Sequence, residues 1–355
     1  MQKVLITAPS FDTGRNVSGV SAVTAQIMYS LRGSVDFVHL QIGQEQIGTK
    51  VGRLFRSIVR TAIAIYIILC GRYDAIHSNT ALNRNSIIRD TLLMTIAAIR
   101  RKNLVLHLHG GFYIHNEPPF LLKRLISGLF YLANTIIVLS NVERVYVTGQ
   151  FPRYASKFLV IYNGVRVSQR NDRTFQGDGT LRVGYIGRLV EEKGINILIE
   201  AISNFDDRDP IKFEIFGEGK FRSSVEALSL IKRNVRFNGV FASTQIADVL
   251  ASIDVLVLPS LNGEGMPMVV VEAMMAGVIP LCTPISSIPE IIDDGGNGFL
   301  FAPGSTLALT TMLRELSKKK TNLTTVSSNA RDFAQRYFDG DKNYSVLLNV
   351  YLKSQ

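Results

Sequence analysis

The chain has 355 residues, of which 46% are hydrophobic and 19% charged, a composition that describes a packed globular protein of two ordinary domains and excludes a largely disordered one. The net charge of +10 is uneven, because residues 1–170 hold 20 Lys and Arg against 7 Asp and Glu, whereas the remainder holds 19 against 22. A basic half predicts an anionic partner, either nucleic acid or an anionic membrane surface, with a solvated basic surface as the alternative.

The two cysteines, Cys70 and Cys282, lie in apolar runs in opposite halves of the chain. This placement predicts buried free thiols in a reducing compartment rather than a disulfide or a metal site. The N-terminus enters a strand-like run at once, so no signal peptide is expected. The apolar run 61–71 would form a helix of only ~16 Å, too short to cross a bilayer.

Short β-branched runs alternate with helix-length segments along the whole chain. They predict strands in the first half at 3–7, 35–40, 73–78, 104–109, 135–140 and 157–162. In the second half they predict strands at 181–187, 213–217, 235–239, 254–260, 278–282 and 298–302. Continuous apolar strands that alternate with helices indicate parallel sheets covered on both faces, an α/β fold.

A polar segment without periodicity separates the two series of strands. It predicts a domain at 1–164, a linker at 165–180, a second domain at 181–340 and a C-terminal helix at 341–355. The helix carries Val346, Leu347, Val350 and Tyr351 on one face, and it could pack back on the N-terminal domain. Ligands of such sheets bind beyond the carboxyl ends of the strands, which predicts a cleft between the domains.

The first half contains a basic, apolar stretch of helices. Arg53, Arg56 and Arg60 share one helical face, and similar basic and apolar segments follow at 87–102 and 118–132. This pattern suits a surface that lies on an anionic bilayer. The alternative is buried helices with solvated Arg ends, and for the run 62–69 burial is expected. Nucleic-acid binding is disfavoured, because no basic and aromatic interleaved element is present.

All five histidines lie within residues 1–115. His107 and His109 fall on the same face of a predicted strand, and His109 ends that strand before two glycines. A histidine at this edge of a sheet lies where ligands bind, so His109 is the candidate site residue and His107 the candidate core residue.

Two motifs of the second half are suited to a nucleotide. In "GYIGRLVEEKG", residues 184–194, Gly187 ends a strand, and Arg188 and Lys193 follow as two cations suited to a diphosphate. In "GEGMPMVVVEAMMAG", residues 263–277, Glu264 and Glu272 are placed to accept hydrogen bonds from sugar hydroxyls. Surface cations and solvated acids are the alternatives, but a Glu inside an otherwise apolar helix needs a partner.

These motifs, with "FGEGK" and "DVLVLPS" between them and "VIYNGV" before them, closely resemble glycosyltransferase family 4 in order and spacing, most strongly over 160–300. Within this family, the sequence resembles the enzymes that make bacterial surface polysaccharides. It implies a GT-B fold, in which two Rossmann-like domains face each other across an interdomain cleft. It also implies retention of the anomeric configuration and no required metal or other cofactor.

The resemblance implies roles for individual residues. Arg188 and Lys193 would hold the donor diphosphate and stabilise the leaving group, Glu264 would contact the sugar hydroxyls, and Glu272 would hold the ribose. His109 matches a histidine near the donor sugar. Gly19 follows Ser18 where the family more often has two glycines, in a loop that approaches the phosphates. The remaining donor-binding positions would be Gly187, Gly265, Met266 and Pro267.

The expected function is transfer of a hexose-type sugar from a UDP- or GDP-sugar to a lipid-linked or polysaccharide acceptor in cell-surface glycan synthesis. The basic N-terminal domain would hold the enzyme peripherally on the inner, cytoplasmic face of the cell membrane. Two alternatives stay open. One is a sugar-nucleotide epimerase on the same fold, which needs acid and base residues around the sugar ring, and the other is a non-catalytic sugar-nucleotide-binding subunit.

Overall fold

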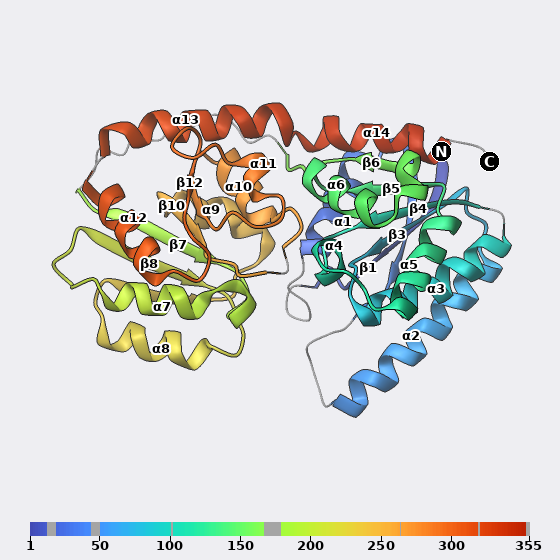
Figure 1. Cartoon of the computed structure of the whole chain (residues 1–355), viewed down its shortest axis with the longest axis horizontal. Coiled ribbons are helices and arrows are strands. Elements are labelled where there is room, and N and C mark those ends of the chain that lie inside the picture. Colours follow the sequence, from blue (N-terminus) through green and yellow to red (C-terminus); the bar gives the residue numbers. More distant parts are fainter. Residues whose placement is uncertain are drawn as a thin grey trace. The chain divides into compact units, whose positions relative to one another are not determined.

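The computed structural model describes residues 1–12, 19–43, 50–100, 102–166, 179–262, 264–318 and 320–352. The chain divides into two compact units, Met1–Arg166 with Gly340–Gln355, and Val167–Asp339. Each unit is built on one six-stranded parallel sheet with helices packed against it (Figure 1). The predicted α/β fold with two Rossmann-like sheets is therefore confirmed. Most of the predicted linker 165–180 lies outside the described residues.

The first unit has the strand order β2-β1-β3-β4-β5-β6. All six strands predicted for the first half are present. They are β1 (Gln2–Ala8), β2 (Val35–Gln41), β3 (Ala75–Thr80), β4 (Asn103–Leu108), β5 (Thr135–Val138) and β6 (Phe158–Val160). The helices are α1 (Gly19–Ser30), α2 (Lys50–Cys70), α3 (Arg84–Ile99), α4 (Phe112–His115), α5 (Phe120–Leu132), α6 (Asn141–Gln150), the 3₁₀ helix η1 (Pro152–Lys157) and α14 (Gly340–Leu352).

The second unit has the strand order β12-β11-β10-β7-β8-β9. Its strands also lie where the sequence predicts them. They are β7 (Leu181–Ile186), β8 (Ile211–Phe216), β9 (Val235–Gly239), β10 (Val255–Leu258), β11 (Ile279–Cys282) and β12 (Phe299–Leu300). The helices are η2 (Glu191–Lys193), α7 (Ile195–Ser203), α8 (Arg222–Ile231), η3 (Ser243–Gln245), α9 (Ile246–Ala251), α10 (Met268–Met275), α11 (Ile288–Ile291), α12 (Thr306–Lys318) and α13 (Lys320–Tyr337).

The strand orders contain one reversal of direction in each sheet. In the first unit the chain winds outward in opposite directions from β1 and β3, and in the second unit from β7 and β10. Ligands of open parallel sheets bind beyond the strand ends at such switch points. The loops that follow β1, β3, β7 and β10 are therefore the places to look for a site.

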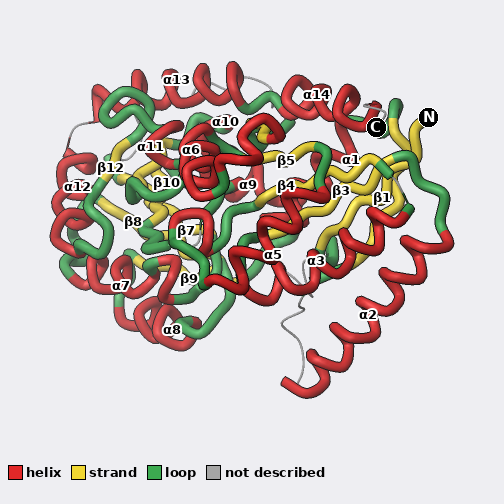
Figure 2. The backbone as a smooth tube through the Cα atoms, turned by 45° about the vertical axis from the view of Figure 1, so that its right-hand side comes forward, coloured by secondary structure: helices red, strands yellow, loops and turns green. Residues whose placement is uncertain are grey.

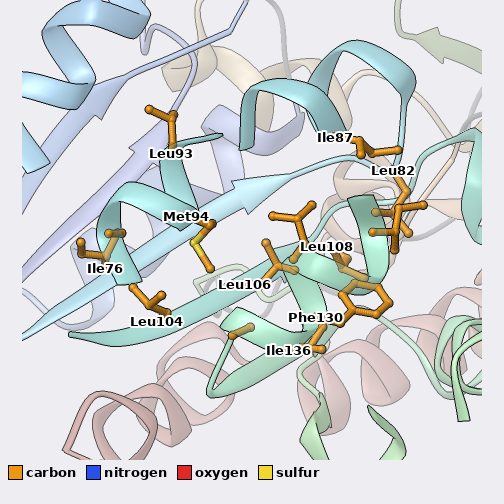
Figure 3. Packing of buried hydrophobic residues seen from close by; sticks show 14 of the residues in the cluster. Ile76, Leu82, Ile87, Leu93, Met94, Leu104, Leu106, Leu108, Phe130 and Ile136 are labelled. Carbon is orange, nitrogen blue, oxygen red and sulfur yellow. The ribbon is translucent and has the colours of Figure 1, made fainter. Parts of the chain in front are cut away.

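One hydrophobic core cluster of the first unit lies between its sheet and the layer formed by α2, α3 and α5 (Figure 2). Leu104, Leu106 and Leu108 of β4 all face this layer, because alternate residues of a strand point to the same side. They pack with Met94 of α3 and Phe130 of α5 (Figure 3). The intervening residues of β4 face the other side of the sheet, and this side carries the histidines.

Helix α2 corrects the expectation that the apolar run 62–69 is buried. Ala64 and Ile68 are buried, but Ile63 is 50% and Tyr66 67% exposed. The helix packs against α3 along one stripe, and no described residue of the unit covers its outer apolar face. Cys70, at the end of α2, is exposed and not buried as predicted, whereas Cys282 in β11 is buried. No described helix is both long and apolar enough to span a bilayer.

The C-terminal helix α14 packs on the first unit, although it follows α13 of the second in sequence (Figure 1). Leu347, Val350 and Tyr351 are buried, whereas Val346 is 41% exposed. The Tyr344 hydroxyl accepts a hydrogen bond from the backbone N–H of Gly164 at 2.9 Å and donates to its carbonyl oxygen at 3.1 Å. The helix is thus attached by both apolar contacts and polar ones.

Candidate functional site

In the second unit, the loops after the neighbouring strands β7 and β10 pack directly on each other. Gly194 has a φ of +66°, and a Cβ atom there would lie 1.9 Å from the carbonyl oxygen of Pro259. The backbone N–H of Leu261 donates to the carbonyl oxygen of Glu192 at 3.0 Å. Only glycine allows this approach, which brings the residues around Lys193 against the end of β10.

The close packing of these two loops brings together two residues that the sequence analysis selected from separate motifs. The Lys193 ammonium forms an ion pair with Oε1 of Glu264, and the two side chains are 16% and 7% exposed. The Ser260 hydroxyl donates to the same oxygen at 2.6 Å. Sequence reasoning missed Ser260, whose signal is a small hydroxyl residue at the end of a switch-point strand.

Arg188 lies beside this pair, on the loop after β7. Its side chain is exposed, and among the described residues none forms a hydrogen bond or ion pair with its guanidinium. Its backbone oxygen accepts a hydrogen bond from the buried Tyr185 hydroxyl at 2.7 Å. Burial raises the pKa of Tyr185, and the charge of Glu264 raises it further. Tyr185 therefore stays a neutral donor that supports the Arg188 loop.

The glycines of "FGEGK" have a packing role that the sequence did not reveal. Gly217 has a φ of +143°, and a Cβ atom there would lie 1.9 Å from the carbonyl oxygen of Gly187. Gly219 has a φ of +153°, and a Cβ atom there would lie 2.5 Å from the carbonyl oxygen of Leu189. The backbone N–H of Gly187 in turn donates to Phe216 at 3.1 Å. The loop after β8 thereby supports the loop that carries Arg188.

The loop between Glu264 and α10 is held in place by a hydrogen bond to its backbone. Its Gly265 carbonyl oxygen accepts a hydrogen bond from the buried Ser287 hydroxyl at 2.7 Å. Met266 and Pro267 are buried, and no side chain caps the N-terminus of α10 at Pro267. The first amide N–H groups of a helix have no partner within it, so this end is suited to an anion. Gly263, the first glycine of the motif, lies outside the described residues.

Glu272, within α10, is half-buried and has no partner among the described residues. Burial raises the pKa of its carboxyl group to about 7. A partly buried carboxylate without donors is unfavourable, and hydrogen bonds from a ligand would relieve the cost. The predicted need of this residue for a partner is therefore not met within the protein.

In the first unit, Gly19 begins α1 at the switch point after β1. Apart from its chain neighbours and the backbone of its own helix, no described atom would lie within 4 Å of a Cβ atom at this position. Packing therefore does not require the glycine, in contrast to Gly194. Ser18, its predicted partner in the loop, lies outside the described residues.

The histidines form a buried row on the side of the sheet that α14 covers. Nδ1 of His77 lies 2.6 Å from the Tyr351 hydroxyl, and Nε2 of His77 lies 3.1 Å from Nδ1 of His107. The rings of His107 and His109 have centroids 4.1 Å apart. Burial lowers the pKa of His77 to about 3 and that of His107 well below its usual range. These imidazoles are therefore neutral at physiological pH.

His109 ends this row at the carboxyl edge of the sheet and is only half-buried. Burial, with a smaller contribution from His77, lowers its pKa to about 3. Its Nε2 lies 2.7 Å from Oδ1 of Asn79, a residue that sequence reasoning missed. His109 and Gly19 belong to the first unit and the residues around Glu264 to the second, so the sequence-based assignment of all of them to one site stays a prediction.

Comparison with protein families finds one match in this chain. Residues 169–333 match the family model described as glycosyl transferases group 1. This range contains Arg188, Lys193, Glu264 and Glu272, and it excludes His109 and Gly19.

Curated relatives are similar mainly over the same region. An uncharacterized glycosyltransferase of Methanocaldococcus jannaschii is 27% identical over 235 residues, which cover 63% of each chain. The putative teichuronic acid biosynthesis glycosyltransferase TuaC of Bacillus subtilis is 31% identical over 167 residues, 47% of this chain and 41% of that protein. The amylovoran biosynthesis glycosyltransferase AmsK of Erwinia amylovora is 27% identical over 179 residues, 48% of this chain and 44% of that protein. The chain thus spans about half the length of these relatives.

Solved structures match nearly the whole chain. HepE of Anabaena, crystallised with UDP and glucose, matches with a TM-score of 0.75 and 20% identity, over 98% of this chain and 99% of that one. The sucrose-phosphate synthase of Thermosynechococcus elongatus matches with a TM-score of 0.76 and 16% identity, over 99% and 98%. The fold is the GT-B fold, as the sequence resemblance implied.

Proposed function

We propose that this chain is a retaining glycosyltransferase that moves a hexose-type sugar from a UDP- or GDP-sugar to a lipid-linked or polysaccharide acceptor in cell-surface glycan synthesis. The observation that carries the proposal is the group of residues at the β7/β10 switch point. There, Arg188 and Glu272 have no described partner, and Lys193 and Glu264 form an ion pair beside them. HepE, which shares the fold, was crystallised with UDP-glucose, and this supports a nucleotide-sugar donor.

The donor diphosphate would bind to cations and amides. Arg188 offers a fork of N–H donors, Lys193 a point charge, and the uncapped N-terminus of α10 unpaired amide groups. Departure of a nucleoside diphosphate builds negative charge, and cations fixed in place stabilise that charge in the transition state. We propose on this basis that no metal ion is needed.

The acidic residues would hold the hydroxyl groups of the donor. Glu272 would accept hydrogen bonds from the ribose hydroxyls, which supply the partners it lacks. Glu264 keeps one carboxylate oxygen for Lys193 and Ser260, and its other oxygen would accept from the sugar hydroxyls. The backbone of Gly265, Met266 and Pro267 would line the same subsite.

The retaining outcome needs no protein nucleophile in this scheme. Glu264 is bound to Lys193 and Ser260 and is therefore held as an acceptor of hydrogen bonds. The acceptor hydroxyl would attack the anomeric carbon on the face that the diphosphate leaves, and the departing phosphate oxygen would take its proton. The new bond then keeps the configuration of the old one.

The acceptor would lie at a membrane surface. The outer faces of α2, α3 and α5 expose large apolar side chains, and the only acidic residue in these helices, Asp90, is buried beside Arg89. The exposed carboxylate next to this face, that of Glu117 before α5, is paired with Lys123 of α5. A basic and apolar face of this kind matches an anionic bilayer. We propose peripheral binding to the inner, cytoplasmic face of the cell membrane, with a lipid-linked glycan as acceptor.

The proposal is tested with the full chain and labelled UDP- and GDP-sugars, with and without a membrane lipid extract. Transfer of label to lipid is expected, and it should persist with a chelator. Lys193→Ala should lower kcat/KM by about 10²–10³-fold, because it removes a fixed charge from the transition state. Lys212→Ala, an exposed lysine at the start of β8, is the matched control and should leave transfer unchanged.

The other outcomes point to the alternatives. Epimerised donor without transfer would indicate a sugar-nucleotide epimerase, and donor binding without turnover a non-catalytic subunit. Inverted stereochemistry in the product would contradict the retaining mechanism. Transfer that stops when metal is removed would contradict the metal-independent one.

A further inference from the structure

Asn79 lies at the end of β3, beside the switch point of the first unit, and it is buried. Its Nδ2 atom lies 2.7 Å from the carbonyl oxygen of Thr7. A carbonyl oxygen can only accept a hydrogen bond, so the atom facing it must be the amide nitrogen. This contact fixes which end of the Asn79 side chain is the donor.

The second N–H of the amide is used as well. Nδ2 of Asn79 lies 3.1 Å from the Thr24 hydroxyl oxygen, and that hydroxyl donates its own hydrogen to the carbonyl oxygen of Val20 at 2.7 Å. Thr24 therefore accepts from Asn79. With both N–H groups of its amide engaged, Asn79 can offer His109 only the carbonyl oxygen Oδ1.

This assignment determines the proton on His109. Its Nε2 lies 2.7 Å from Oδ1 of Asn79, so Nε2 must carry a hydrogen. A neutral imidazole has one N–H, which leaves Nδ1 as a bare acceptor. Among the described residues, no group donates to this nitrogen. The ring of His107 lies beside that of His109, with ring centroids 4.1 Å apart and ring planes tilted by 36°.

We infer that Asn79 is a positioning residue that holds His109 in the Nε2–H form, so that Nδ1 accepts a hydrogen bond from a hydroxyl group of the bound sugar. The identity of the ligand rests on the proposed function. A bare nitrogen attracts a hydroxyl and repels a carboxylate, so this position selects a neutral hexose over a uronic acid. Asn79 itself would touch no substrate.

The test measures the tautomer directly, in the full chain without any sugar. Histidine labelled with ¹⁵N distinguishes protonated from bare ring nitrogens by NMR, and the loss of signals in His109→Ala assigns this residue. The wild-type protein should show a protonated Nε2 and a bare Nδ1 at neutral pH. Asn79→Ala should give a mixture of tautomers, because the acceptor for Nε2–H is gone.

Asn297→Ala is the matched control, because Asn297 is a buried asparagine of the second unit whose side chain bonds the backbone of Ile291 and Asp293. It should leave the His109 tautomer unchanged. A protonated Nδ1 in the wild-type protein, or an unchanged tautomer in Asn79→Ala, would overturn the inference.

If Asn79→Ala does not fold, Asn79→Asp keeps the acceptor and adds a negative charge. His109 should then become protonated at a higher pH, and an unchanged titration would overturn the inference.

Kinetics separate this inference from the proposed function. If the chain transfers sugar, Asn79→Ala should lower kcat/KM about tenfold in the wild-type background, the effect of about one hydrogen bond. It should have no further effect in His109→Ala, and an equal effect in both backgrounds would contradict positioning through His109. UDP-glucuronic acid should be a poorer donor than UDP-glucose. The expected tautomer without any transfer would contradict the proposed function and the sugar as the ligand of His109, and it would leave the role of Asn79 in fixing the tautomer standing.

Discussion

Lys193 and Glu264 were each selected from the sequence for a ligand, yet in the structure they bind each other. Their pairing depends on Gly194, which lets the loop after β7 reach the carbonyl oxygen of Pro259. The pair keeps both side chains in place before a donor arrives. An enzyme that stabilises a leaving group gains from charges that need no reorganisation when the reaction occurs.

Glu272 makes the stability of the protein depend on pH. Its pKa is raised from 4.5 to about 7, so between these values the folded protein holds a proton that the unfolded chain has lost. Its contribution to the free energy of unfolding is therefore largest at low pH and declines as pH rises through this window. Glu272→Gln should remove this decline and make the protein more stable than the wild type above about pH 7.

The measurement is urea denaturation at a series of pH values for the wild type and the variant. Glu200→Gln, which changes an exposed carboxyl group on α7, is the control and should keep the wild-type decline. UDP binding to the wild type should tighten as pH rises through about 7, because the ionised carboxylate is the better acceptor for ribose hydroxyls. Parallel stability profiles for wild type and Glu272→Gln would contradict this account of Glu272.

At the scale of elements, α14 connects the end of the chain to the histidine row. Tyr351 reaches His77 at 2.6 Å, and Asn103 of β4 donates to the carbonyl oxygen of Val350 at 2.7 Å. Helix α14, at the C-terminal end of the sequence, thus contacts the row of histidines that ends at His109. The packing of α14 thus affects the histidine row of the candidate site, although no residue of α14 is among the proposed ligand-binding residues.

Two tyrosines of α14 allow the role of this contact to be tested. Tyr351→Phe leaves Nδ1 of His77 buried without a partner and should lower the free energy of unfolding by about 1–3 kcal/mol. Tyr344→Phe removes a buried hydroxyl that bonds Gly164, so a cost of similar size is expected. Only Tyr351→Phe should change the ¹⁵N signals of His77 and His107. Equal changes in these signals for both variants would contradict a specific contact between α14 and the histidines.

At the scale of the molecule, the excess of Lys and Arg in the first half of the chain occurs together with exposed apolar side chains. Helices α2, α3 and α5 lie side by side over one face of the first sheet (Figures 1 and 2), and large apolar side chains stay uncovered on them. The most exposed of these residues are Tyr66 on α2, Ile99 on α3, and Phe120 and Leu121 on α5. A positively charged surface alone could bind many kinds of anion. A positively charged surface that also exposes apolar side chains favours binding to an anionic bilayer.

Binding to vesicles tests this surface. The full chain should sediment with vesicles that contain phosphatidylglycerol and much less with pure phosphatidylcholine. The double substitution Ile63→Glu and Tyr66→Glu on α2 should weaken binding at least tenfold, because burial of one large apolar side chain contributes about 1.5–3 kcal/mol. The control is Leu230→Glu with Ile231→Glu on α8, two residues that are 88% and 79% exposed in the second unit. Equal loss in both double variants would contradict a membrane face on α2.

The sequence by itself determined the positions of the elements, and it pointed to the candidate donor-side residues. All twelve strands were predicted where they occur, because each is a short local run of β-branched and other apolar residues between helix-length segments. Arg188, Lys193, Glu264 and Glu272 were found because their motifs are short and their spacing is local. The sequence also showed the excess of positive charge in the first half.

Tertiary structure alone decided which residues meet. Lys193 and Glu264 are 71 positions apart, and His77 and Tyr351 are 274 apart, so no local pattern could pair them. Asn79 and Ser260 are ordinary polar residues in sequence, and they matter only through the side chains that the sheets bring beside them. Helix α2 is apolar on several sides, and periodicity cannot tell which stripe is covered. Burial and hydrogen bonding depend on neighbours distant in sequence, and these are set only when the sheets and helices pack.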